Sequence, residues 1–206
     1  MALRLSTGFR NKIMTPAADG GLSWAELLKG GIIKVFSGNQ PASADLTEPG
    51  THLFTLTLEG GAESTSGSLV EGKMYLIVSF ETGDDFTNVG ASDNETGVVF
   101  KATGTTPTTW TNGSKLRADV GLEFGNAVAG KIGIPTDALW RGKVLTSGIA
   151  GWFRFYDAAL ETGASETAIR YDGRVASSGG ELTMPVLSVT AGSTQTADEI
   201  NLTMPA

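Results

Sequence analysis

Apolar and polar residues alternate with a period of two along much of the chain after residue 31, which is the pattern of half-buried β-strands. Residues 51–58 alternate most strictly: His52, Phe54, Leu56 and Leu58 share one face and Thr51, Leu53, Thr55 and Thr57 the other. The same reasoning predicts strands over residues 32–36, 152–156, 169–171 and 200–204, and over 182–189 with an edge position or a bulge at Pro185.

The first 30 residues carry helix signals instead. Ser23 and Glu26 have the spacing of a capping box, which predicts a short helix over residues 24–29 that ends at Gly30. Upstream, Thr7 is placed to cap another helical turn. We therefore expect a short N-terminal helical segment ahead of the strands.

The middle of the chain has a different character. Residues 60–68 are rich in Gly and Ser without periodicity, which indicates a flexible connector. Strands are expected after it at 74–80, at 97–102 and in a weaker segment around Trp110. We interpret residues 70–118 as an inserted small β module, set into a β-rich body made of residues 1–69 and 119–206.

Composition supports a mainly β class. The chain has 28 Gly in 206 residues, abundant Ser and Thr and no Cys, so it suits short strands joined by tight turns and lacks disulfides and thiolate metal sites. Helical patterns do not alternate with the strands, which disfavours a parallel α/β fold. We predict a β-sandwich or jelly-roll-like body.

Charge and hydropathy exclude several functions. The formal net charge is −7, and Arg4, Arg10 and Lys12 are too scattered to form a phosphate-binding track, so nucleic-acid binding is not expected. These cations are read as solvated surface, with an acidic partner as the alternative. No apolar run reaches the ~20 residues of a membrane span, and the N-terminus lacks a signal-peptide core. The protein is expected to be made in the cytosol.

His52 is the only histidine, so any catalysis by histidine must use it. It lies in phase with Phe54 and Leu56, and no motif supplies the nucleophile and orienting group that a catalytic base requires. A structural histidine is therefore the preferred interpretation. The sequence also singles out no carboxylate pair for glycoside hydrolysis, although only the fold can set such a spacing.

Acidic residues gather at Asp84 and Asp85 and again at Asp93, Asn94 and Glu95. Oxygen-rich loops can hold calcium, but the alternating ligand spacing of an EF-hand is missing. We interpret these residues as solvated turns, and a loop calcium ion stays an open alternative. The glycine pairs 60–61 and 179–180 lack the Lys and Ser or Thr of a phosphate loop and are read as turns.

The aromatic residues allow two interpretations. A carbohydrate-binding platform is one, and a half-buried core with neighbour contacts is the other and preferred one. Exposure of Trp110 or Trp140 would instead favour a partner interface. The residues concerned are Trp24, Trp110, Trp140, Trp152, Phe153, Phe155 and Tyr156.

Five segments on either side of the middle block stand out: LRLSTGFRN (residues 3–11), GIIKVFSGNQPASAD (31–45), GLEFG (121–125), GIAGWFRF (148–155) and YDGRV (171–175). Together they resemble a family of small structural proteins of tailed-bacteriophage virions. The middle is similar to a small β module that recurs in phage structural and tail proteins, through GKMYLIV (72–78), DFTNVGA (85–91) and GVVFKATG (97–104). Neither resemblance brings a catalytic residue with it.

The resemblance implies a non-enzymatic virion protein, without cofactors, that is assembled in the host cytoplasm. We expect a capsid decoration, or cement, protein that binds the major capsid protein as a homo-oligomer, with the N-terminal segment helping to clamp neighbours. The alternatives are a tail tube, tip or baseplate-associated protein, and a receptor- or carbohydrate-binding module. An enzyme such as a cell-wall hydrolase ranks last, and we predict no catalytic, cofactor or metal residues.

Overall fold

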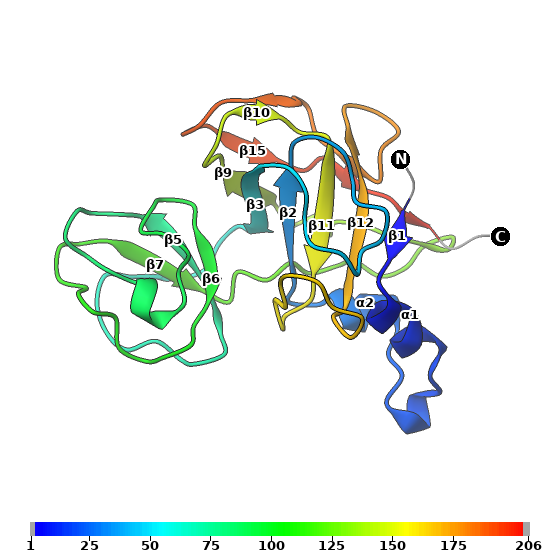
Figure 1. The fold of residues 1–206 in the computed structure, drawn as a ribbon, viewed down its shortest axis with the longest axis horizontal. Coiled ribbons are helices and arrows are strands. Elements are labelled where there is room, and N and C mark those ends of the chain that lie inside the picture. The colour runs from blue at the N-terminus through cyan, green and yellow to red at the C-terminus, as the bar shows by residue number, and fades with distance from the viewer. Residues whose placement is uncertain (1–2, 204–206) are drawn as a thin grey trace. The chain divides into compact units, whose positions relative to one another are not determined.

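The structure is a computed structural model that describes residues 3–203, and it divides the chain into two compact units (Figure 1). Residues 1–58 and 122–206 form the first unit, here called the body, and residues 59–121 form the second, here called the insert. The module expected at 70–118 lies within the insert. With 32% strand and 10% helix, the chain is mainly β, as predicted.

The body is built on a curled, mostly antiparallel sheet. At its centre, β2 (Ile32–Phe36) pairs with β3 (His52–Leu58) and β11 (Trp152–Tyr156), and β11 pairs with β12 (Arg170–Ala176). Within the described residues the sheet has nine strands, in the order β15-β9-β3-β2-β11-β12-β13-β16, with β1 beside β12. The outer strands are β1 (Arg4–Leu5), β9 (Trp140–Lys143), β13 (Leu182–Thr183), β15 (Thr194–Thr196) and β16 (Glu199–Ile200). Only the β12–β13 pair of these described strands is parallel.

The predicted strands at the C-terminal end are shorter than expected. Residues 182–189 divide around Pro185 into β13 and β14 (Ser188–Val189), because proline cannot donate to a strand ladder. Residues 200–204 divide into β16 and β17 (Leu202–Thr203), and Met204 lies outside the described residues. Two small sheets result: β14 pairs with β10 (Gly148–Ile149), and β17 with β8 (Lys131–Ile132).

Both faces of the central strands are covered. In β3 the five residues from Leu53 to Thr57 are all buried, so its strict alternation does not mark a solvent face. On one side an aromatic core forms, in which Phe155 stacks on Tyr171 with ring centroids 5.4 Å apart and Phe9 meets Tyr171 edge-on. Phe9 comes from the N-terminal helix, which thereby closes the core.

Two short helices precede the sheet. α1 (Thr7–Met14) is capped by Ser6, whose hydroxyl accepts from the Phe9 N–H at 3.1 Å, and not by Thr7 as predicted. Thr7 is the first helical residue, and its N–H and hydroxyl both donate to a carboxylate described below. α2 (Trp24–Leu28) begins at the predicted capping box of Ser23 and Glu26. A 3₁₀ turn, η1 (Ala17–Asp19), lies between them.

The insert is a four-stranded antiparallel sheet in the order β4-β7-β5-β6. Its strands are β4 (Glu63–Ser64), β5 (Met74–Ser79), β6 (Val99–Lys101) and β7 (Lys115–Ala118), and η2 (Thr87–Val89) is a 3₁₀ turn. Residues 60–68, expected as a connector, thus contribute β4. Trp110 lies outside the strands: its ring packs edge-on against Phe86, and its N–H donates to the Ser114 carbonyl at 2.7 Å.

Candidate functional site

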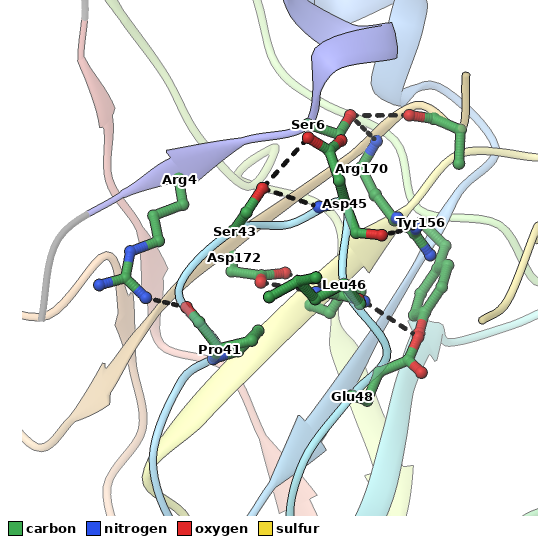
Figure 2. Close-up of polar contacts among 12 residues, drawn as sticks. Arg4, Ser6, Pro41, Ser43, Asp45, Leu46, Glu48, Tyr156, Arg170 and Asp172 are labelled. Atoms are coloured by element: carbon green, nitrogen blue, oxygen red, sulfur yellow. Dashed lines mark hydrogen bonds and ion pairs between the residues drawn. The ribbon is translucent and has the colours of Figure 1, made fainter. Parts of the chain in front are cut away.

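The 37–51 loop, which joins β2 to β3, passes across β11 and β12 in Figure 1 and is held there by buried polar side chains. A 15-residue loop is long for two neighbouring antiparallel strands, and such loops are commonly functional. We therefore treat the polar network beneath it, shown in Figure 2, as the candidate site.

A buried ion pair forms the centre of this network. Arg154 in β11 and Asp172 in β12 face each other in the strand register, and both side chains are fully buried. Arg154 Nε and Nη2 donate to the two carboxylate oxygens at 2.6 and 2.8 Å, a bidentate geometry that is stronger than a single contact. The remaining nitrogen, Nη1, donates to the Leu46 carbonyl of the loop at 2.7 Å.

Glu48 ties the loop to the same arginine. Its carboxylate lies 3.2 Å from Arg154 Nη1 and accepts a hydrogen bond from the hydroxyl of Tyr156, the last residue of β11 (Figure 2). Burial works to raise the pKa of Glu48, but the Tyr156 hydrogen bond and the charge of Arg154 outweigh it and lower the pKa. The carboxylate is therefore ionised at neutral pH.

A second buried arginine donates to main-chain carbonyls. Arg170, at the start of β12, is 0% exposed and donates to the carbonyls of Asp45, Gly163 and Ser165 at 3.2, 2.7 and 3.2 Å. Its guanidinium thus joins the 37–51 loop to the segment that leads into β12. The several N–H donors of one guanidinium allow a single side chain to hold these carbonyls together.

The loop is also bound to the N-terminal segment. Asp45 accepts the Thr7 N–H at 2.7 Å and the Thr7 hydroxyl at 2.8 Å, and Arg4 donates to the Pro41 carbonyl (Figure 2). Burial tends to raise the pKa of Asp45, but these hydrogen bonds prevail and the net pKa is lowered. The start of the chain, the loop and the central strands therefore form one connected structure.

The network of Arg154, Asp172 and Glu48, here called the clamp, holds the 37–51 loop on the sheet. Burial raises the pKa of Asp172, and hydrogen bonding and charge from Arg154 oppose the rise. Both carboxylate oxygens of Asp172 accept hydrogen bonds from Arg154. Burial, together with the contact with Glu48, raises the pKa of Tyr156 far above the neutral range. A carboxylate engaged at both oxygens and a phenol that keeps its proton are poorly suited to general acid–base catalysis.

His52 lies at the start of β3, half-buried beside Phe36, with ring centroids 5.5 Å apart. Burial and the charge of Lys34 lower its pKa to about 4, so the ring is neutral at pH 7. Its Nε2 lies 3.0 Å from the Thr55 hydroxyl, but Thr55 is only 2% exposed within the sheet. The geometry is that of a structural histidine.

In the insert, Asp84 is 3% exposed, which corrects the interpretation of this residue as a solvated turn. Its carboxylate accepts four N–H groups: from the Thr111 backbone, from the backbone and side chain of Asn112, and from the Ser114 backbone, at 2.8 to 3.0 Å. Burial works to raise the pKa of Asp84, but these bonds lower it to about 2. The side chain holds residues 111–114 in place.

Asp85 also stabilises a turn: it accepts the Thr87 N–H and hydroxyl and the Asn94 side chain, and these contacts lower its pKa to about 2. Asp93 accepts the Asn94 N–H at 2.7 Å. In the described part of the chain, no three His, Cys, Asp or Glu residues gather as metal ligands would. No helix among those residues is long and apolar enough to cross a membrane.

The tryptophans do not form an open platform. Trp110, Trp140 and Trp152 are 8%, 0% and 0% exposed, and Trp24 is half-buried. Their burial supports the core interpretation and removes the basis for a tryptophan-lined carbohydrate surface. Because neither Trp110 nor Trp140 is exposed, neither residue indicates a partner interface.

Comparison of the chain with models of protein families, with curated proteins and with solved structures found no match in any of the three.

Proposed function

We propose that this protein is a non-enzymatic structural component of a tailed-phage virion, and that it decorates the capsid by binding the major capsid protein as a homo-oligomer. In this proposal it is assembled in the host cytoplasm and needs no cofactor. Its function is to hold a fixed shape against neighbouring proteins.

The main support for the proposal is that buried ionisable residues hold the 37–51 loop on the sheet. Arg154 and Asp172 are fully buried, and with Glu48 they clamp a long loop onto the sheet. A buried ion pair is a poor source of net stability, and its best-attested use is to specify one arrangement among several. A surface loop of fixed shape suits a protein that must fit a repeating partner.

Two further observations agree with this proposal. The segments that resemble virion structural proteins include residues 31–45 and 148–155, which contain much of the 37–51 loop and Arg154. The remaining candidates for chemistry, His52 and Asp84, are engaged in contacts within the chain. These arguments favour a structural role over a hydrolase.

Reconstitution on particles lacking this protein tests the proposal. Purified protein is mixed with bare capsids and separately with isolated tails, and bound protein is measured by sedimentation and located by cryo-electron microscopy. We expect saturable, regularly spaced density on the capsid. Density confined to the tail would replace decoration by a tail role, and glycan binding or peptidoglycan turnover without particle binding would overturn the structural proposal.

The 37–51 loop gives this assay a matched pair of variants. Glu48→Gln removes the charge that joins the loop to Arg154, whereas Glu199→Gln removes the same charge from an exposed position on β16. We expect the first variant to weaken capsid binding if the loop is part of the contact surface. The second should bind as the wild type does.

A further inference from the structure

The chain contains seven asparagines, and Asn112 is the one that is followed by glycine. It lies in the insert, in an exposed bend over residues 111–114 that leads into β7. The backbone nitrogen of the next residue can attack the side-chain carbonyl carbon of an asparagine. The attack is easiest when that residue is glycine, because no side chain hinders the approach. Asn112 and Gly113 are therefore the pair in this chain that favours the reaction.

The backbone around Gly113 leaves the attacking nitrogen free. The φ angle of Gly113 is +100°, which side chains rarely adopt, so this position requires glycine. The N–H groups of Thr111, Asn112 and Ser114 all donate to Asp84. Within the described residues, the Gly113 N–H donates no hydrogen bond. The nitrogen that must attack is thus not held by another acceptor.

The carboxamide of Asn112 lies against a buried acid. Its Nδ2 donates to Asp84 Oδ1 at 3.0 Å, and Asp84 is 3% exposed. Gly83 also approaches it closely, since a Cβ added at Gly83 would lie 3.0 Å from the same Nδ2. A group that replaces this NH₂ group therefore also lies beside the Asp84 carboxylate.

The reaction exchanges a side-chain amide for an acid. The Gly113 nitrogen attacks Cγ of Asn112 and loses its proton to solvent, while the side-chain nitrogen takes a proton from solvent and leaves as ammonia. The product is a cyclic succinimide, which water opens at either of its carbonyls. One opening gives aspartate, and the other gives isoaspartate, in which the main chain runs through the former side-chain carbonyl. Overall, a carboxamide and a water molecule give a carboxylate and an ammonium ion.

A carboxylate at position 112 would lie among acids. Besides Asp84, Glu81 lies beside the bend, because a Cβ added at Gly113 would be 4.0 Å from its Cγ. The nearest cation along the chain, Lys115, is paired with Glu63 at 3.3 Å. Two carboxylates that share a site disfavour each other's ionised form. The product therefore repels the group that holds the bend in place.

We propose that Asn112 is a deamidation site, and that its conversion to aspartate or isoaspartate replaces a hydrogen bond with Asp84 by a repulsion and loosens the insert. The effect is confined to the insert, because Asp84 and the residues that donate to it all belong to that unit. The rigidity of the insert thus declines with the age of the protein. This inference goes beyond the proposed function and does not depend on it.

The first test follows the chemistry in the intact chain. Purified protein is incubated at mildly alkaline pH, which favours loss of the proton from the attacking nitrogen, and is digested at intervals for mass spectrometry. We expect the Asn112 peptide to exchange NH₂ for OH, and a methyltransferase specific for isoaspartate to label it. The peptide of Asn39, which is exposed and followed by Gln40, is the control and should stay unchanged. Equal rates at both sites, or no change at Asn112, would overturn the assignment.

Variants test the consequence for the insert. Asn112→Asp is the aspartate product, and Asn112→Ala removes the donor to Asp84 without adding a charge. Hydrogen exchange with mass spectrometry reads peptides of the insert and of the body separately. We expect protection of β7 amides to fall about tenfold further in Asn112→Asp than in Asn112→Ala, because the like charge adds to the lost bond. Ser92→Asp adds the same charge at an exposed position of the insert and should leave this protection unchanged.

Protein aged until Asn112 is converted gives an independent measurement on the natural sequence. Its insert should lose protection as Asn112→Asp does, while the peptides of the body keep theirs. Equal losses in Asn112→Asp and Asn112→Ala would overturn the repulsion with Asp84. Full protection in the aged protein would overturn the loosening of the insert, even where the deamidation itself occurs.

Discussion

Replacement of Asp172 by Asn is the sharpest test of the clamp beneath the 37–51 loop. The substitution keeps the shape of the side chain but removes the negative charge and turns an NH₂ group toward one of the two Arg154 nitrogens. Arg154 would then stay fully buried with only the half-buried Glu48, 3.2 Å away, as a counter-ion. Removing one partner of a buried ion pair lowers the free energy of unfolding by about 3 to 5 kcal/mol. Because Glu48 remains as a second counter-ion, we expect a loss at the lower end of this range, about 3 kcal/mol.

The expected loss can be read from the tryptophan fluorescence of the body. Trp110 is the only tryptophan of the insert, so a Trp110→Phe background leaves Trp24, Trp140 and Trp152 to report on the body alone. Urea titration should then show Asp172→Asn destabilised by about 3 kcal/mol, with a midpoint of thermal unfolding lower by roughly 6 to 12 °C for a unit of this size.

The matched control is Asp19→Asn, which removes the same charge at an exposed position of the body and should change stability by less than about 0.5 kcal/mol. If Asp172→Asn also costs less than about 1 kcal/mol, the clamp does not hold the loop and the structural argument for a fixed contact surface is wrong.

Three further predictions concern other parts of the chain. The pKa of His52 is lowered to about 4, so between about pH 6.5 and 4 the unfolded chain binds a proton that the folded chain does not. The free energy of unfolding should therefore fall as the pH falls through this window. Urea titrations should show a smaller fall for His52→Gln. Asp84→Ala should destabilise the insert by roughly 3 kcal/mol, followed by Trp110 fluorescence, because four N–H groups lose their acceptor, whereas Asp93→Ala should cost less than about 1 kcal/mol; equal losses would refute this role of Asp84. Replacing residues 59–121 by a short Gly-Ser linker should leave the body folded by circular dichroism and fluorescence, and an unfolded product would show that the body depends on the insert.

The linker replacement is expected to succeed because of where the insert joins the body. Leu122 exchanges backbone hydrogen bonds with Gly30 and Gly31 at 2.9 and 2.7 Å. β3 ends at Leu58, and its register with β2 places Leu56 opposite Ile33, which is two residues from Gly31. Both ends of the insert therefore flank one short stretch of the body, which a few residues can bridge.

The sequence predicts those elements whose signals are local. The central strands β2, β3 and β11 follow from alternation, and α2 follows from the spacing of Ser23 and Glu26. Strand boundaries near the C-terminus, and β4 in a segment without periodicity, depend on pairing with distant residues. Local patterns carry no information about such partners.

The clamp was missed for the same reason. Arg154 lies between Phe153 and Phe155, so alternation assigns it to a polar face, and Asp172 reads likewise. Both are fully buried because the 37–51 loop covers that face, and its anchors, Leu46 and Glu48, belong to a segment with no periodic pattern. A strand arginine flanked by aromatics on both sides is the one signal that suggests a buried cation in need of an acid.

The arginines that hold the 37–51 loop grip main-chain oxygens: Arg4 binds that of Pro41, Arg154 that of Leu46 and Arg170 that of Asp45. Every amino acid supplies a carbonyl, so these contacts do not depend on the side chains of Pro41 and Leu46, unlike the carboxylate contacts of Asp45 and Glu48. Exposed positions such as Leu46 are thus free to diversify while the path of the chain stays the same. Exposed side chains of the 37–51 loop can therefore change without loss of the main-chain contacts that hold the loop on the sheet.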